Sequence, residues 1–341
     1  MTNTLYDALI APHSQSERPF LACDDGQTVS YAAFVKRVAQ LAHVLVNAGI
    51  TPGDRVVVQA PKVADAIVLY AAALQAGAVY LPLNTAYTQA ELSYFIEDAS
   101  PQIVVCDTKD EAAIKELCVP FGATVLTLGA DGTGSLPSTA DQAPDQFDTV
   151  PRGPNDLAAL LYTSGTTGRS KGAMLSHKNL LSNARSLTDL WEITGQDRLI
   201  HALPIFHTHG LFVAMNTSML AGAEVRFMSA FKPDMIIAEI PKSTLLMGVP
   251  TFYTRLLDDP RMTRALCADM RLFVSGSAPL LAETHTAFTQ LTGHHILERY
   301  GMTETNMITS NPFHGDRIAG TVGYPLPGTE VIITDPDTGV P

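Results

Sequence analysis

Apolar and polar positions along the chain form short apolar runs that alternate with longer amphipathic stretches. In the first third of the chain the apolar runs predict strands at Asp54–Ala60, Val79–Leu83, Gln102–Asp107 and Thr124–Leu128. The amphipathic stretches predict helices at Tyr31–Ala48, Ala64–Ala76 and Asp110–Cys118, and a further helix that is capped by Thr88 and runs through Ala99. Apolar strands that alternate with helices predict an α/β fold, in which helices cover both faces of a parallel sheet.

The alternation stops at Gly129–Pro154, which is rich in Gly, Ser, Thr, Asp and Pro and predicts an exposed linker without a catalytic role. It then resumes with a second series. The predicted strands are Leu157–Leu161, Arg198–Leu203, Glu224–Met228, Thr244–Gly248, Arg271–Gly276 and His295–Tyr300. The predicted helices are His177–Trp191 (capped by Ser176), His209–Leu220, Asp234–Ile240, Thr251–Leu257 and Ala282–Leu291.

From Arg317 the helical pattern gives way to turn residues, and Glu330–Thr334 predicts a strand of a small antiparallel or barrel-like β subdomain. DPDTG, ending at Gly339, is a hairpin-turn signal with no returning strand, which favours a truncated chain. We therefore expect one large domain with four parts: a first α/β series (1–128), a linker (129–154), a second α/β series (155–316) and the start of a β subdomain (317–341).

Composition and charge narrow the function classes. Hydrophobic residues make up 46% of the 341 residues and charged residues 16%, which is globular composition. The net charge of −12 disfavours nucleic acid and anionic membranes as partners, and no apolar run approaches the roughly 18 residues of a membrane span. The start, MTNTLYDALI, does not resemble a signal peptide, and the four scattered cysteines lack metal-binding spacing. These features predict a cytoplasmic protein with free, buried thiols.

The richest chemical signal is LYTSGTTGRSKG, from Leu161 to Gly172, which lies between a predicted strand and a predicted helix. Glycine lets the backbone approach a ligand closely, and backbone amides can turn toward an anion. Hydroxyl groups add hydrogen-bond donors, and Lys171 adds a mobile positive charge. The stretch therefore predicts a phosphate-binding loop, although it lacks the G-x-x-x-x-G-K-[ST] pattern of a P-loop.

This stretch closely resembles the phosphate loop of the adenylate-forming superfamily, which contains acyl-CoA synthetases, adenylation domains and luciferases. Further motifs of that family follow in order, so the resemblance covers essentially the whole chain: PIFHTHG (Pro204–Gly210), GVPTFYTRLL (Gly248–Leu257), SGSAPL (Ser275–Leu280) and ERYGMTE (Glu298–Glu304). The resemblance implies the family's large N-terminal domain, with two helix-covered, mostly parallel sheets. It also implies that a mobile C-terminal domain, which carries a catalytic lysine and much of the CoA site, lies outside these residues.

The resemblance implies an enzyme that uses ATP and Mg²⁺, with CoA as co-substrate. The catalytic residues that it implies are Thr163, Lys171, His207, Thr303 and Glu304, with Glu304 and Thr163 at the metal. The ATP site that it implies comprises Thr163, Ser164, Gly165, Thr166, Thr167, Gly168, Lys171, Ser277, Ala278, Pro279, Glu298, Arg299, Tyr300, Gly301, Met302 and Thr303. Tyr300 is expected to stack on adenine, and a hard carboxylate such as Glu304 suits Mg²⁺.

The acyl substrate is expected to contact His207, Arg271, Ser277, Arg299 and Met302, whereas His209 is the weaker of the two histidine candidates. Several of these motifs resemble malonate-activating members of the family. A short dicarboxylate needs a fixed cation for its second carboxylate, ideally arginine. Arg271 is favoured for that role over Arg299, although spacing alone does not rank them. The alternatives are methylmalonate, a short monocarboxylate, or a nucleotide-binding module without full turnover. The oligomeric state stays open.

Overall fold

The computed structural model describes residues 2–163 and 169–340, and its larger sheet has nine strands. These strands are β1 (Pro19–Cys23), β2 (Thr28–Ser30), β9 (Arg198–His201), β10 (Glu224–Phe227), β11 (Leu245–Gly248), β12 (Leu272–Ser275), β13 (Leu297–Met302), β14 (Asn306–Ser310) and β15 (Tyr324–Pro325). Their order is β15-β14-β13-β12-β11-β9-β10-β1-β2. The strands from β13 to β1 in this order pair in parallel, and only the outer β2, β14 and β15 pair antiparallel.

The second sheet has six strands in the order β6-β5-β3-β4-β7-β8. They are β3 (Arg55–Gln59), β4 (Val79–Pro82), β5 (Ile103–Cys106), β6 (Thr124–Thr127), β7 (Leu157–Thr163) and β8 (Lys171–Ser176). All pairs are parallel except the β7–β8 hairpin. The prediction of an α/β fold with two mostly parallel sheets is confirmed. The two sheets nevertheless do not correspond to the chain before and after the expected linker. The early strands β1 and β2 join the larger sheet, and the later strands β7 and β8 join the smaller one.

The helices begin where local capping chemistry favours them. Ser30 accepts a hydrogen bond from the Ala33 amide, and Thr88 and Ser176 each form a reciprocal capping box. The α-helices are α1 (Tyr6–Leu9), α2 (Tyr31–Asn47), α3 (Ala64–Gln75), α4 (Gln89–Ala99), α5 (Glu111–Cys118), α6 (Ser135–Ala140), α7 (His177–Leu190), α8 (Asn216–Ala221), α9 (Pro233–Glu239), α10 (Pro250–Leu257) and α11 (Ala282–Thr292). A π-helix, η4 (His209–Met215), leads directly into α8, where an ordinary α-helix was predicted.

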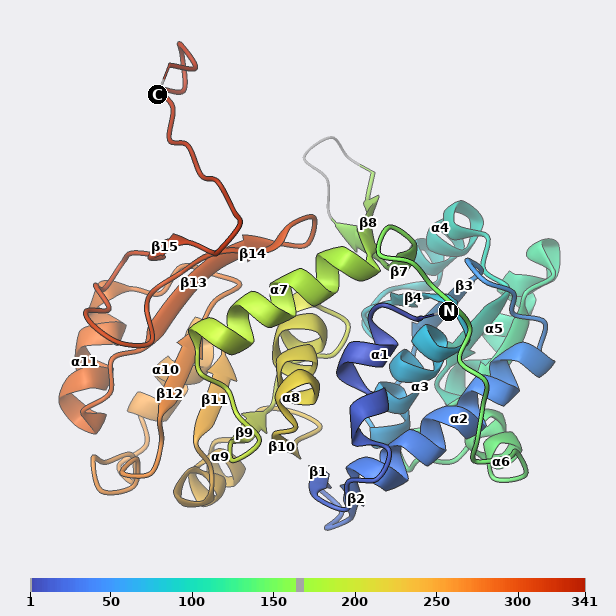
Figure 1. Cartoon of the computed structure of the whole chain (residues 1–341), viewed down its shortest axis with the longest axis horizontal. Helices are drawn as coiled ribbons and strands as arrows, with labels where there is room; N and C mark the ends of the chain where they lie inside the picture. The colour runs from blue at the N-terminus through green and yellow to red at the C-terminus, as the bar shows by residue number, and fades with distance from the viewer. Residues whose placement is uncertain (1, 164–168, 341) are drawn as a thin grey trace.

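Figure 1 shows the nine-stranded sheet on one side, the six-stranded sheet on the other, and α1 and α8 between them. Buried side chains join the two halves here. The Tyr31 hydroxyl on α2 donates to the carbonyls of Ser218 and Ala223, and the Tyr70 hydroxyl on α3 donates to Asn216 on α8. A continuous apolar cluster therefore runs from α2 and α3 to η4 and β10.

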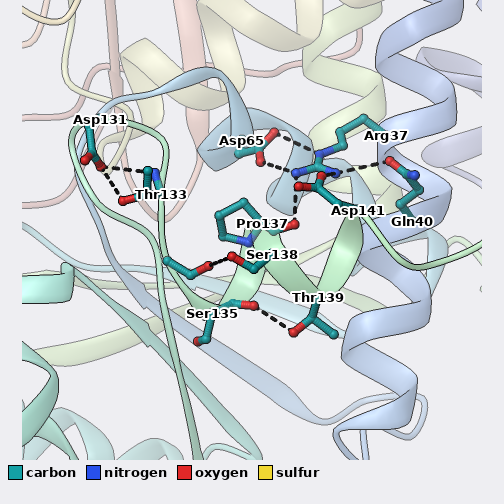
Figure 2. Close-up of polar contacts among 11 residues, drawn as sticks. Arg37, Gln40, Asp65, Asp131, Thr133, Ser135, Pro137, Ser138, Thr139 and Asp141 are labelled. Atoms are coloured by element: carbon teal, nitrogen blue, oxygen red, sulfur yellow. Dashed lines mark hydrogen bonds and ion pairs between the residues drawn. The ribbon is translucent and has the colours of Figure 1, made fainter.

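The segment between β6 and β7 differs from the expected exposed linker, because it contains α6 with Leu136 and Ala140 fully buried. Figure 2 shows how Arg37 on α2 holds this segment in place. Its guanidinium pairs with Asp65 at 2.9 Å and with Asp141 at 2.7 Å. The composition suggested a linker because α6 is short and polar on its exposed side, whereas Leu136, Pro137 and Ala140 are buried against the fold.

The predicted strand at Glu330–Thr334 is absent from the described residues, and only β15 pairs with β14 beyond residue 317. Ile332 and Ile333 are exposed, and in Figure 1 the chain after β15 runs away from the body of the molecule. The four cysteines are free thiols as predicted; three are buried and Cys23 is half-buried. Within residues 2–163 and 169–340, none of the helices combines the length and the apolar character needed to cross a bilayer.

Candidate functional site

A cavity of about 620 Å³ opens where the parallel strands of the larger sheet end. The segments that follow β9, β11 and β12 line it, and the last residues of β13 complete the wall. Thr163 at the end of β7 and Lys171 at the start of β8 reach it from the smaller sheet. Ligands of α/β sheets bind at the carboxyl ends of the strands, and the cavity occupies that position.

The cavity brings together nine of the residues predicted from the sequence. They are Thr163, Lys171, His207, Ser277, Arg299, Gly301, Met302, Thr303 and Glu304. Its other lining residues were not among the predicted site residues, although His209 was considered: Leu203, Pro204, Thr208, His209, Gly210, Val249 and Met307. Five of these seven lie within or directly before PIFHTHG, so taking that whole motif as part of the site would have identified them.

Not all predicted site residues are among the described residues that line the cavity. Ser164, Gly165, Thr166, Thr167 and Gly168 lie outside the described residues. Ala278 and Pro279 are exposed beyond the wall, and Tyr300 is 50% exposed. Side chains alternate along a strand, so Glu298 and Tyr300 point away from the face that Arg299 presents to the cavity. Glu298 is buried, accepts a hydrogen bond from the Gly320 amide at 3.2 Å, and has a pKa raised by burial.

Arg299 is the most unusual group in the cavity wall. Its side chain is only 4% exposed, and no ion pair joins it to any carboxylate among the described residues. Its Nε and Nη2 atoms are buried without a hydrogen-bond partner. Burial lowers the pKa of Arg299 to about 10, which still leaves the guanidinium charged at neutral pH. A buried cation without a partner is costly, so this arginine is suited to an anionic ligand.

Neutral polar groups line the same cavity as this cation. His209 is buried, and burial, together with the positive charge of Arg299, holds its pKa well below the usual value. Its Nδ1 atom lies 3.3 Å from the Ser277 hydroxyl, while its Nε2 atom has no partner. The buried hydroxyl of Thr208 is also without a partner. These groups can donate hydrogen bonds to an anion without adding a competing negative charge.

The structure does not place Arg271 in the cavity, contrary to the expectation that it would bind the distal carboxylate. Arg271 directly precedes β12, at the opposite end of the strand from the cavity. Its Nε and Nη2 atoms each lie 3.0 Å from Asp197, whose side chain is 2% exposed. Nη2 also donates to the Glu192 carbonyl. The charge of Arg271 is therefore already paired with a carboxylate of the protein.

Glu304 and Thr163 were expected at the metal, and both line the cavity from different sheets. The Thr163 hydroxyl donates to Glu304 Oε1 at 3.4 Å, so the two side chains meet without further rearrangement. No group of three or more His, Cys, Asp or Glu side chains in the described ranges could hold a metal ion. One accessible carboxylate nevertheless fits Mg²⁺, which in nucleotide sites takes most of its ligands from phosphate and water.

Known proteins resemble this chain over most of its length. A model of the family described as AMP-binding enzyme matches residues 10–341. The chain is 36% identical over 289 residues to mouse mitochondrial malonate–CoA ligase ACSF3, covering 79% of this chain and 49% of the mouse protein. It is 31% identical over 333 residues to feruloyl-CoA synthase of an Amycolatopsis species, covering 96% and 65%.

Among solved structures, ATP-bound MatB from Rhodopseudomonas palustris superposes with a TM-score of 0.97 at 54% identity. That match covers 100% of this chain and 68% of MatB. The chain spans about half the length of the curated malonate–CoA ligases that it matches. Together with the two parallel sheets and a cavity built from the family's own motifs, these matches establish that the chain belongs to the AMP-binding enzyme family, the adenylate-forming enzymes.

Proposed function

We propose that this protein is an ATP-dependent acid–CoA ligase whose acid substrate is malonate. Its first half-reaction forms malonyl-adenylate and pyrophosphate, and its second transfers the malonyl group to CoA. Membership of the family and the similarity to malonate–CoA ligases support the ligase class. A cytoplasmic location stays a prediction.

The observation that supports malonate is the buried, unpartnered Arg299 in the cavity wall. A dicarboxylate brings a second negative charge that must not be buried alone. The Arg299 guanidinium can receive that carboxylate through two parallel hydrogen bonds, and Ser277 and His209 line the same cavity. An aromatic or fatty acid has no second carboxylate, so it would leave this buried charge without a partner.

The reacting carboxylate of malonate would then point toward the nucleotide. One of its oxygens attacks the α-phosphorus of ATP, and the bond from that phosphorus to the pyrophosphate oxygen breaks. Lys171 and Thr303 line the same cavity and are suited to hold phosphate oxygens during this displacement. Glu304 and Thr163 would hold Mg²⁺, which when bound neutralises phosphate charge.

Methylmalonate is the second candidate, because it carries the same two carboxylates and would use the same arginine. A short monocarboxylate is less favoured, since it would leave the Arg299 guanidinium without a counter-charge. A panel of short acids in a pyrophosphate-release assay ranks these substrates directly.

The decisive variant is Arg299→Met in the full-length protein. Removing one partner of a buried charge pair costs about 2–5 kcal/mol, so malonate activity should fall about thirty- to several-thousand-fold. ATP binding and activity with butyrate should change little, because methionine offers an apolar wall of similar length. Pyrophosphate release with malonate and with butyrate gives the comparison.

Arg271→Met is the matched control, since Arg271 lies at the far end of the sheet. It should keep the parent preference for malonate over butyrate. If Arg299→Met also kept that preference, the assignment of a dicarboxylate substrate would be wrong.

A further inference from the structure

The guanidinium of Arg299 lies directly against the backbone of Gly276, which follows β12. A Cβ atom at position 276 would lie 2.3 Å from Arg299 Cζ and 2.5 Å from both Nε and Nη1. Real Cβ atoms essentially never show contacts this short, so any side chain at 276 must displace the guanidinium. The position of the cation therefore depends on the missing side chain of a residue that does not itself line the cavity.

Two neighbouring glycines behave differently. A Cβ atom at Gly210 would meet the backbone oxygen of Pro204 at 2.0 Å, and one at Gly301 would meet the backbone oxygen of Asn306 at 2.1 Å. In both cases the backbone itself would have to move. At Gly276 the three nearest atoms all belong to the end of a flexible side chain. An alanine there would shift the arginine rather than the fold.

The backbone conformation at Gly276 also tolerates a side chain. Gly276 is not among the glycines with a positive φ, so an L-residue faces no intrinsic strain there. Its amide donates to the Gly248 carbonyl at 3.3 Å, a bond that alanine would keep. Nothing in the local backbone therefore requires glycine at position 276. The close approach of the Arg299 side chain is the remaining physical reason for a glycine there.

We infer that Gly276 is a positioning residue that sets selectivity for dicarboxylates by leaving room for the Arg299 guanidinium. This inference rests on the proposed function, because the guanidinium matters for selectivity only if it receives the second carboxylate. In Gly276→Ala the guanidinium moves from the wall, and its two hydrogen-bond donors no longer face the carboxylate together. The variant keeps the positive charge but loses its orientation toward the carboxylate.

The test compares Gly276→Ala, Arg299→Met and the double variant in the full-length protein. A misplacement of about 1 Å can cost about a hundred-fold in rate, so Gly276→Ala should lose about that much malonate kcat/KM. The KM for ATP and the activity with butyrate should stay close to parent values. In the Arg299→Met background, Gly276→Ala should cause no further loss, because it acts only through the arginine.

Gly248→Ala on the adjacent strand is the matched control. Its Cβ would also meet a side chain, that of Phe252 at 2.9 Å, but not Arg299. It should leave the ratio of malonate to butyrate activity unchanged. A parent-like ratio in Gly276→Ala, or an equal loss with and without Arg299, would overturn the inference.

A crystal structure of Gly276→Ala separates this inference from the proposed function. A displaced guanidinium supports the positioning role whatever the substrate, and an unmoved guanidinium refutes it. Conversely, if Arg299→Met keeps the malonate preference while the guanidinium moves in Gly276→Ala, the proposed substrate fails and the positioning of Arg299 by Gly276 stands.

Discussion

Arg271 and Arg299 carry the same charge but meet different surroundings, and each surrounding has a measurable consequence. Burial alone would raise the pKa of Asp197, but hydrogen bonds from Arg271, Thr194 and Thr244 outweigh it and hold the pKa below 3.8. Arg271→Met leaves this buried carboxylate with one strong partner fewer. We expect a loss of about 1–3 kcal/mol of unfolding free energy, because the arginine is itself one-third exposed.

The sign of the pH dependence follows from the lowered pKa of Asp197. Its contribution to stability is present above the unfolded value of 3.8 and is lost as the pH falls through the folded value. The difference between Arg271→Met and the parent, measured by urea unfolding, should therefore shrink below about pH 4. A difference that grows in acid would contradict this account.

Sequence motifs identified both arginines but favoured Arg271, which lies outside the cavity, over Arg299, which lines it. The useful signal was their position within the strands. Arg271 comes before the apolar run of β12, whereas Arg299 comes after Leu297 and Glu298, near the end of β13. Because ligands of parallel sheets bind at the carboxyl ends of the strands, the later position predicts the residue that lines the cavity. The burial and missing partners of Arg299 could not be predicted, since they depend on packing against Gly276.

At the scale of elements, the β7–β8 hairpin that carries Thr163 and Lys171 is tied to α4. The Tyr94 hydroxyl on α4 donates to the Ser170 carbonyl at 2.7 Å, next to Lys171. Tyr94→Phe removes this bond, which is worth about 0.5–1.5 kcal/mol. If the tether helps to hold Lys171 for the nucleotide, the KM for ATP should rise about two- to tenfold.

Tyr87→Phe is the matched control for this tether. Tyr87 packs on Phe95 in the same aromatic group, with ring centroids 5.0 Å apart, but its hydroxyl makes no hydrogen bond within the described residues. It should leave the KM for ATP at the parent value. Equal effects of the two variants would mean that packing of the rings, rather than the tether, supports the hairpin.

Elements with strong local signals were predicted well. The caps at Thr88 and Ser176 are confirmed, because capping depends on residues three positions apart. The predicted strand at Glu330–Thr334 was wrong, since an apolar run forms a strand only where a partner edge is available. α6 was missed because the contacts that hold it are distant in sequence: Asp141, which follows α6, pairs with Arg37 about a hundred residues earlier in the chain.

At the scale of the molecule, periodicity predicted the layers but not how the chain distributes strands between the two sheets. β1 pairs with β10, more than 200 residues later, and no local pattern encodes such a partner. The boundaries at 128 and 154 therefore stay predictions about the chain and do not describe the sheets. The sequence motifs predicted the cavity better than periodicity predicted the sheets, because residues of several motifs line the same cavity.

Buried histidines should make the whole fold sensitive to acid. Burial and the nearby Arg152 charge lower the pKa of His177 to about 4, and burial and the nearby Lys62 charge lower that of His201 to about 3. Both become protonated on unfolding once the pH falls below 6.5. Between pH 7.5 and pH 5.5 each should reduce the unfolding free energy by about 1.4 kcal/mol.

Urea unfolding at the two pH values measures this loss, and His177→Asn isolates one contribution. Asparagine can still accept a hydrogen bond from the Leu5 amide, which His177 Nδ1 accepts at 3.3 Å. The variant should lose about 1.4 kcal/mol less than the parent over the same range. An unchanged pH slope would show that His177 is already charged in the folded protein.

Because the strands β9 to β13 are parallel, substitutions that affect stability and substitutions that affect activity should cluster at opposite ends of these strands. The amino ends of these strands hold the Arg271–Asp197 pair, while the carboxyl ends form the cavity wall. In a mutational scan that measures both protein abundance and turnover, variants at the amino ends should lower abundance and leave turnover per molecule intact. Variants at the carboxyl ends should leave abundance intact and lower turnover per molecule. Within each βα repeat, residues fewer than ten positions apart would thus fall into opposite classes.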